Sequence, residues 1–365
     1  MGQGSKRLLT PIEITALLIG IMADINSASA PNSVVNIAKQ DGWISAALGA
    51  IYPLYVAFIA IYIAGRFPKD NILILSKKYF GNVIGTMANF LFFLSFFSYF
   101  PSVSSTTLDV SRTYIVGFLT PLKIYIVMML LGSYSAYKGV KVLARVCVLN
   151  IFAFVAIIAL SFIILMYGSL MNIMPIFGSG FMSIAKGAVG TTYDYAAMEI
   201  IFLLYPLIND SKKLKSSVLK AVAFICFMYT WIVFITIYCL GIDIIPKTIW
   251  SFFSATESIK IEALHNLRFL YIFLWILTAF KTIALLYYVC ISILHEFHKS
   301  IGNKISYGVL GIIVIFITMT FFPDRLSRES IVSVTTKFSV GFNLLYITVI
   351  AAIIFVKKDG KGAIK

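Results

Sequence analysis

The sequence predicts an all-α integral membrane protein with ten transmembrane helices, of which the first and the sixth are broken. Hydrophobic residues make up 60% of the 365 residues and charged residues only 12%. A soluble domain is about 45–50% apolar and about 25% charged. Long apolar stretches recur along the whole chain, and polar residues interrupt two of them at corresponding positions. Together these observations favour a membrane bundle of two five-helix halves, the inverted-repeat arrangement of many secondary transporters.

The expected spans each hold about 20 mainly apolar residues, enough to cross the hydrocarbon core. They cover 12–37, 43–65, 83–108, 120–137, 142–167, 181–207, 216–241, 264–294, 305–322 and 331–356. Because the connections are short, we expect one transmembrane domain over 1–365 and no soluble domain. Its repeats are expected at about 8–167 and about 181–356. No small-residue cleavage site follows a short apolar core, so no cleaved signal is expected.

The net charge of +15 is distributed as expected for a membrane protein rather than for a nucleic-acid-binding protein. With both termini in the cytoplasm, 19 of the 30 Lys and Arg residues fall on the inner side and 10 on the outer side, with Lys281 inside a span. This excess obeys the positive-inside rule. Basic loops beside anionic lipid account for the charge, so membrane lipid and not nucleic acid is the expected partner.

Span 1 is interrupted near its centre. The interruption holds Asp24, Ile25, Asn26, Ser27 and Ala28, followed by Ser29, Ala30, Pro31 and Asn32. Such groups are tolerated at this depth only where the backbone is buried in protein or lines a cavity. Ser27 or Ser29 is expected to cap a second half-helix, with Pro31 in its first turn. Its free N–H groups would attract an anion, such as an amino-acid carboxylate, and the carbonyls that end the first half-helix would attract a cation.

Span 6 is irregular in the matching place, over 187–199 (GAVGTTYDYAAME). Two glycines, two threonines and two carboxylates weaken the helix there. We therefore expect a ligand site between the two breaks. Its residues from span 1 are Asp24, Ile25, Asn26, Ser27 and Ala28. Those from span 6 are Tyr193, Asp194, Tyr195 and Ala197. The alternative is that both breaks are ordinary kinks with polar groups turned into the bundle.

Lys281 lies deep in span 8, too far from either end to reach water easily. A lysine at a helix centre costs about 2.5–3.5 kcal/mol, so a partner is expected. Asp24, Asp194 and Glu199 are the carboxylates within reach of the broken helices. The ammonium would either stand in for a coupling cation or form a static ion pair that fixes helix packing.

Other chemistry finds little support. The four cysteines lie in hydrophobic stretches without a CxxC pair, and the sequence HEFH at 295–298 lacks the spacing of the HExxH zinc motif. No phosphate-binding loop or nucleophile–base pair stands out. We therefore expect no metal site, no cofactor and no enzymatic activity.

Several short segments resemble the B subunit of bacterial spore nutrient-germinant receptors (the GerAB/GerKB type), in the amino acid–polyamine–organocation transporter superfamily. The likeness runs from about residue 8 to 358 and includes Glu199. The segments are 41–45 (DGWIS), 66–68 (RFP), 138–145 (KGVKVLAR), 172–176 (NIMPI), 205–210 (YPLIND), 212–215 (KKLK) and 280–281 (FK).

The resemblance implies a LeuT-like fold with a ligand site between spans 1 and 6. It also implies a spore inner-membrane receptor with a larger A subunit and a C lipoprotein, in which an amino acid or similar nutrient triggers germination. Two features depart from the family. Asp24 replaces a small residue, which makes a cationic or amine ligand more plausible if the carboxylate is free. Residues 195–199 (YAAME) replace FPFGE, so unwinding is expected earlier, near 190–193.

Two functions remain open from the sequence. The first is a ligand-sensing subunit that signals to partner subunits through a shift between two states. The second is a proton- or sodium-coupled permease for amino acids or amines. Both need the same broken-helix site.

Overall fold

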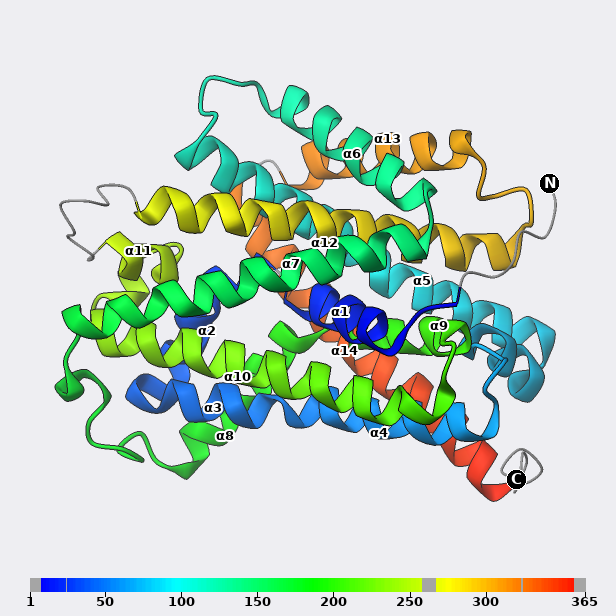
Figure 1. Ribbon diagram of the computed structural model, residues 1–365, viewed down its shortest axis with the longest axis horizontal. Coiled ribbons are helices and arrows are strands. Elements are labelled where there is room, and N and C mark those ends of the chain that lie inside the picture. The colour runs from blue at the N-terminus through cyan, green and yellow to red at the C-terminus, as the bar shows by residue number, and fades with distance from the viewer. Residues whose placement is uncertain (1–7, 24, 258–266, 323, 358–365) are drawn as a thin grey trace.

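The computed structural model describes residues 8–23, 25–257, 267–322 and 324–357. Helices account for the fold of these residues, and the only extended pairing among them is an isolated bridge between Leu9 and Ile208. Figure 1 shows the long helices running roughly side by side in one bundle. The predicted all-α membrane fold is therefore confirmed.

The first half of the chain supplies five spans. Its elements are α1 (Pro11–Met22), η1 (Ile25–Ala28), α2 (Ala30–Ala38), η2 (Lys39–Asp41), α3 (Gly42–Gly49), α4 (Ile51–Arg66), α5 (Ile72–Tyr114), α6 (Pro121–Tyr137), α7 (Val140–Ser161) and η3 (Phe162–Tyr167).

The second half supplies the other five. Its elements are η4 (Leu170–Ile173), α8 (Phe181–Thr191), η5 (Thr192–Tyr195), η6 (Met198–Ile200), α9 (Ile201–Leu204), η7 (Tyr205–Leu207), η8 (Ser211–Lys213), α10 (Leu214–Leu240), η9 (Ile245–Lys247), α11 (Ser251–Glu257), α12 (Leu267–Phe297), α13 (Lys304–Phe321) and α14 (Arg325–Val356).

Seven helical segments of the described chain are individually long and apolar enough to cross a membrane. The first half of span 1 and the whole of span 6 are missing from that set because their helices are short, whereas α2 is counted within the segment Ala30–Arg66. Helix α6 falls just short at 17 residues. The chain is thus a multi-pass membrane protein. Helix α5 extends beyond the predicted third span because a short helix before Gly81, where φ is +80°, continues into it.

The broken span 1 lies at the centre of the bundle. Helix α1 packs against α7 and α10, and α2 packs against α8 of the other broken span. Lipid is as apolar as leucine, so close backbone approach contributes much of the association between membrane helices. Gly20 of α1 shows this, because an added Cβ there would lie 2.9 Å from Sγ of Cys147 in α7.

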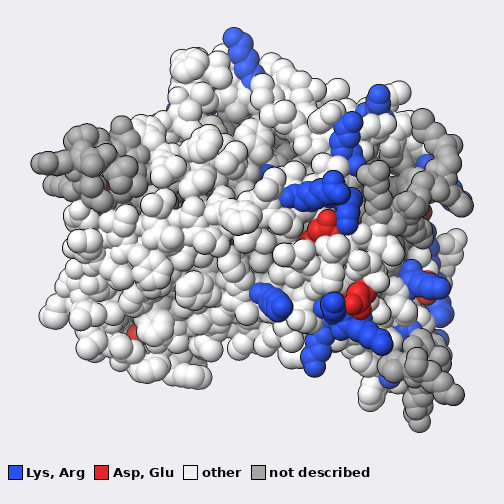
Figure 2. All heavy atoms as spheres, viewed as in Figure 1, with Lys and Arg blue, Asp and Glu red and all other residues white. Residues whose placement is uncertain are grey.

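Lys and Arg side chains gather toward one end of the molecule. Figure 2 shows most of those on this face at its right-hand end, over the region where α9 lies and α10 begins, and few at the opposite end of the described surface. The asymmetry follows the charge distribution that the sequence predicts for inner and outer loops.

Candidate functional site

Span 1 breaks where its polar residues predict. Helix α1 ends at Met22, residues Ile25–Ala28 form a turn of 3-10 helix, and α2 begins at Ala30 with Pro31 in its first turn. Asp24 lies outside the described residues. Ile25 and Asn26 belong to the turn, Ser27 is half-buried and Ala28 is fully buried. Ser29 occupies the N-cap position, but its side chain makes no capping hydrogen bond, so the expected serine cap is wrong for Ser29.

The end of α1 is completed by other helices. The last carbonyls of an α-helix have no partner within the helix. Here the Ile19 carbonyl accepts a hydrogen bond from the Ala23 amide at 2.8 Å, and the Met22 carbonyl accepts one from the Tyr229 hydroxyl at 3.1 Å. Gly20 lies between them, and its carbonyl accepts a hydrogen bond from Lys281. Side chains from α10 and α12 therefore hydrogen-bond to the last carbonyls of α1 and stabilise the break.

Span 6 breaks later than the sequence predicts. The helix tightens to 3-10 geometry from Thr192, but the chain leaves helical geometry only at Ala196, which is extended, and Ala197, where φ is +70°. A left-handed residue other than glycine costs about 1–3 kcal/mol and persists only where packing imposes it. Both alanines are buried, and the hydroxyl of the preceding Tyr195 donates to the Ala46 carbonyl at 2.8 Å. Tertiary contacts thus place the break without glycine or proline.

A cavity of about 20 Å³ lies between the two breaks. Its lining comes from spans 1, 3, 6, 8 and 10 and comprises Ile21, Tyr99, Ser102, Val103, Tyr193, Asp194, Ala196, Ala197, Thr282, Leu286, Val332 and Thr336. This volume holds about one water molecule, so the cavity is nearly closed. Three predicted residues, Tyr193, Asp194 and Ala197, line it. Tyr195 does not, because its ring packs against Tyr229 with centroids 5.0 Å apart.

A larger cavity of about 260 Å³ adjoins the first and shares Ser102, Asp194 and Val332 with it. Its other lining residues are Ser29, Ser33, Thr106, Ile249, Trp250, Arg325, Arg328, Glu329 and Ser333. Asp194 therefore borders both spaces. Arg328, which is 6% exposed, forms an ion pair with Asp109 of α5 beside this cavity. The pair joins span 3 to span 10 beside this cavity.

The opposite end of the junction is closed by polar contacts. The Leu9 amide donates a hydrogen bond to the Leu207 carbonyl of span 6 at 2.7 Å. The Leu9 carbonyl accepts one from the Asn209 amide at 2.9 Å. Lys141 of α7 contacts Glu13 of α1 at 2.6 Å. These contacts close this end of the junction, and the central cavity has room for about one water molecule.

Lys281 is placed beside span 1, as its depth predicts. Its ammonium donates to the Gly20 carbonyl and lies 5.0 Å from the ring centre of Phe154 in α7. Glu199, one of its three predicted partners, accepts a hydrogen bond from Tyr52 of α4 instead. No ion pair between Lys281 and Glu199 is present within the described chain. Glu199 is therefore not its partner in this conformation, and Asp24, another of the three predicted partners, lies outside the described residues.

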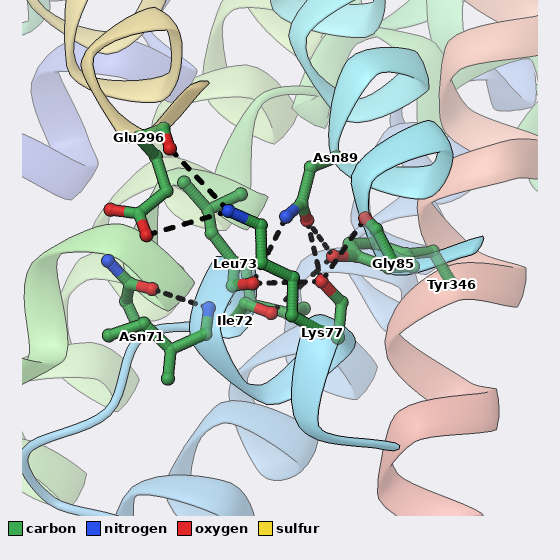
Figure 3. Close-up of polar contacts among 10 residues, drawn as sticks. Asn71, Ile72, Leu73, Lys77, Gly85, Asn89, Glu296 and Tyr346 are labelled. Atoms are coloured by element: carbon green, nitrogen blue, oxygen red, sulfur yellow. Dashed lines mark hydrogen bonds and ion pairs between the residues drawn. The ribbon is translucent and has the colours of Figure 1, made fainter. Parts of the chain in front are cut away.

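A polar cluster at the start of α5 was not anticipated from the sequence. Asn89 accepts hydrogen bonds from the hydroxyls of Ser76 at 2.8 Å and Tyr346 at 2.7 Å, and donates to the Leu73 carbonyl at 3.0 Å. Figure 3 shows Asn89 lying between the short helix at Leu73 and Tyr346 of α14. The only signal in the sequence was a polar residue in an apolar stretch.

The same short helix also reaches α12. Figure 3 shows Lys77 pointing toward Glu296, with Nζ 3.8 Å from the carboxylate and 3.5 Å from the backbone carbonyl. Gly85 allows this helix to lie close, because a Cβ there would come within 2.6 Å of the Lys77 Cα. The cluster therefore ties the start of span 3 to spans 8 and 10.

Comparisons with solved structures agree on the fold. The chain superposes on MhsT in complex with L-phenylalanine with a TM-score of 0.73 at 15% identity, covering 96% of this chain and 90% of that one. A Na⁺-coupled sialic acid symporter in a substrate-bound outward-open state gives 0.68 at 13% identity, with 92% and 78% covered. These likenesses confirm the LeuT-like fold.

Comparisons of sequence give the family. The chain is 23% identical over 320 residues to the spore germination protein YndE of Bacillus subtilis, covering 85% of this chain and 87% of that protein. It is 22% identical over 344 residues to GerQB of Bacillus cereus (93% of each) and 24% identical over 324 residues to the germination protein KB of Bacillus subtilis (85% and 86%). A family model described as spore germination protein matches residues 8–327. The chain therefore belongs to the spore germination protein family.

Proposed function

We propose that this protein is the transporter-like, ligand-sensing subunit of a spore nutrient germinant receptor. The observation that carries the proposal is the junction of two broken helices at a cavity bordered by Asp194. Broken helices of this kind form substrate sites in secondary transporters. In a germination protein with such a junction, ligand binding can shift the helix bundle from one conformation to another. The energy for the shift comes from the difference in the ligand's affinity for the two conformations.

The proposed ligand is an amino acid or a similar small amine. The Asp194 carboxylate borders both cavities and would attract an ammonium group. The N-terminal end of α2 begins nearby, with Ser29 and Ser33 lining the larger cavity. Free N–H groups at a helix start favour a carboxylate. A zwitterion fits both features. Asp24, Ile25, Asn26, Ser27, Ala28 and Tyr193 complete the proposed site.

Ligand-dependent thermal stabilisation tests this site. The purified protein is heated with each member of a panel of amino acids and amines. A ligand at 100 times its Kd stabilises the folded state by about 2.7 kcal/mol, which raises the melting temperature. Asp194→Asn should abolish the shift, whereas Asp210→Asn, in the exposed turn before η8, should keep it. No shift with any ligand, or equal shifts in both variants, would count against the proposal.

In the cell, the proposed partners are a larger A subunit and a C lipoprotein in the spore inner membrane, with both termini of this chain in the cytoplasm. The charge asymmetry in Figure 2 supports that orientation. Spores that lack the gene should fail to respond to one nutrient, and affinity-tagged protein should co-purify with both partners. A normal response to every nutrient would argue against the receptor role.

The second candidate is a cation-coupled permease, and one contact favours it. Half-helix carbonyls coordinate coupling cations in secondary transporters, and Lys281 places its ammonium on such a carbonyl at Gly20. The permease predicts gradient-driven uptake of labelled substrate by proteoliposomes that contain this chain alone. The sensing subunit predicts binding without uptake.

A further inference from the structure

A second group of buried polar atoms lies on the far side of the span 6 break. Glu199 follows Ala197 in η6 and is fully buried. One carboxyl oxygen, Oε1, accepts a hydrogen bond from the Tyr52 hydroxyl. Asn343 of α14 is also fully buried and lies close enough to influence the same carboxyl group. Glu199 lines neither of the two cavities described above, so this group is distinct from the proposed nutrient site.

Three polar atoms here make no hydrogen bond of good geometry among the described residues. They are Oε2 of Glu199 and both amide atoms of Asn343, although the Asn343 amide lies close to the Glu199 carboxyl group. Leaving a buried polar atom unpaired costs about 1–3 kcal/mol. A bare carboxylate away from water costs far more, and proteins normally avoid it by neutralising the group. Something must therefore neutralise Glu199.

Among the described residues, no Lys, Arg or His side chain forms an ion pair with Glu199. Helix α4 faces the carboxyl group with Tyr52, and Tyr99 of α5 faces Tyr52 in turn. Helix α1 packs against η6, but its one charged residue is Glu13, which is held at its inner end by Lys141. Helix α9 is wholly apolar, and α14 contributes the neutral Asn343.

A proton satisfies these atoms better than a metal ion does. Hard metal cations such as Ca²⁺ and Mg²⁺ take about six or more oxygen ligands. Only two unpartnered oxygens, Oε2 of Glu199 and Oδ1 of Asn343, are available, and no group of three or more metal-binding side chains exists in the described chain. A proton on Oε2 needs a single acceptor, and the amide oxygen of Asn343, beside the same carboxyl group, is an unpartnered one.

We propose that Glu199 is a proton-binding site and that it carries its proton in this conformation. The neutral acid accepts from Tyr52 and donates to Asn343, so one proton joins η6 to spans 2 and 10. Loss of the proton leaves an anion among these three elements. The anion favours any arrangement of the bundle that admits water beside Glu199. The proposal does not depend on which nutrient binds.

Infrared spectroscopy of the purified protein tests this directly. A protonated, buried carboxyl group gives a carbonyl stretch that is separate from the bands of ionised carboxylates and shifts in D₂O. We expect this band at neutral pH in the wild type and its loss in Glu199→Gln, which keeps the shape of the neutral acid. The matched control Glu296→Gln removes a partly exposed glutamate and should leave the band unchanged.

Two further arms keep the proposal falsifiable if Glu199→Gln fails to fold. Tyr52→Phe and Asn343→Leu should each shift the band without removing it, because each removes one hydrogen-bond partner. Replacing sodium by a large organic cation should leave the wild-type band unchanged. Absence of the band in the wild type, its survival in Glu199→Gln, or its replacement by carboxylate bands when sodium is added would each overturn the assignment of a proton.

Discussion

The ammonium group of Lys281 in α12 donates a hydrogen bond to the carbonyl of Gly20 in the last turn of α1. The two residues are 261 positions apart in sequence, and Lys281 is only 2% exposed. The contact places a positive charge at the negative end of a half-helix, where helix carbonyls attract cations. It therefore stabilises the break in span 1 from a neighbouring span.

Replacing Lys281 by Met should weaken this junction. The Gly20 carbonyl would lose its partner, and an unpaired buried acceptor costs about 1–3 kcal/mol. We expect a lower melting temperature in detergent and a loss of nutrient response in spores. Lys213→Met removes a lysine whose side chain is 68% exposed and serves as the control. A Lys281→Met protein with wild-type stability and response would show that the contact has no role in packing or coupling.

Gly20 itself should not accept a side chain. A Cβ at this position would lie 2.9 Å from Sγ of Cys147 and 3.3 Å from Cδ of Lys281. Overpacking of this kind costs about 1–3 kcal/mol. Gly20→Ala should therefore lower the melting temperature. The control is Gly308→Ala in α13, where nothing lies within 4 Å of the new Cβ. Equal effects at the two sites would mean that helix propensity, rather than close packing, governs Gly20.

The cluster around Asn89 should behave as one unit. Tyr346→Phe removes the hydroxyl that donates to Asn89, and one such hydrogen bond is worth about 0.5–1.5 kcal/mol. Asn89→Leu removes three hydrogen bonds, those from Ser76 and Tyr346 and the one to the Leu73 carbonyl. Asn89→Leu should therefore be the more destabilising change. In a double-mutant cycle measured by thermal melting, the double variant should lose less free energy of unfolding than the sum of the losses in the two single variants. Strict additivity would contradict the shared network.

The ion pair between Arg328 and Asp109 should restrict entry to the ligand site. The Arg328 side chain is 8% exposed and that of Asp109 36% exposed, so the pair lies between a buried pair, which is costly to break, and an exposed pair, which contributes about 0–1 kcal/mol. We expect Arg328→Gln to increase the rate at which a water-soluble thiol reagent labels Ser102→Cys by about tenfold, which corresponds to about 1.4 kcal/mol in favour of open states. The background protein has its four cysteines replaced.

The control for that measurement is Arg325→Gln, because Arg325 lines the same cavity but pairs with Glu329 at the surface, where the two side chains are 40% and 54% exposed. It should change labelling of Ser102→Cys much less. Equal labelling in all three proteins would show that the Arg328 pair does not limit access.

Much of the fold is determined by the sequence alone. Apolar stretches of about 20 residues must cross the membrane as helices, because unsatisfied backbone groups in lipid cost several kcal/mol each. The same cost makes the polar interruption at 24–32 a visible break and makes Lys281 a residue that requires a partner inside the bundle. These features are local, so a pattern along the chain is sufficient to detect them.

Only the tertiary structure decided which groups meet. Lys281 was expected to pair with one of Asp24, Asp194 and Glu199. Of these, Glu199 bonds to Tyr52, 147 positions away, while Lys281 contacts the Gly20 carbonyl, 261 positions away. Ala197 adopts a left-handed conformation that its own side chain disfavours, because the packed neighbours impose it. Contacts between distant segments depend on how whole helices pack, and no local pattern in the sequence records them.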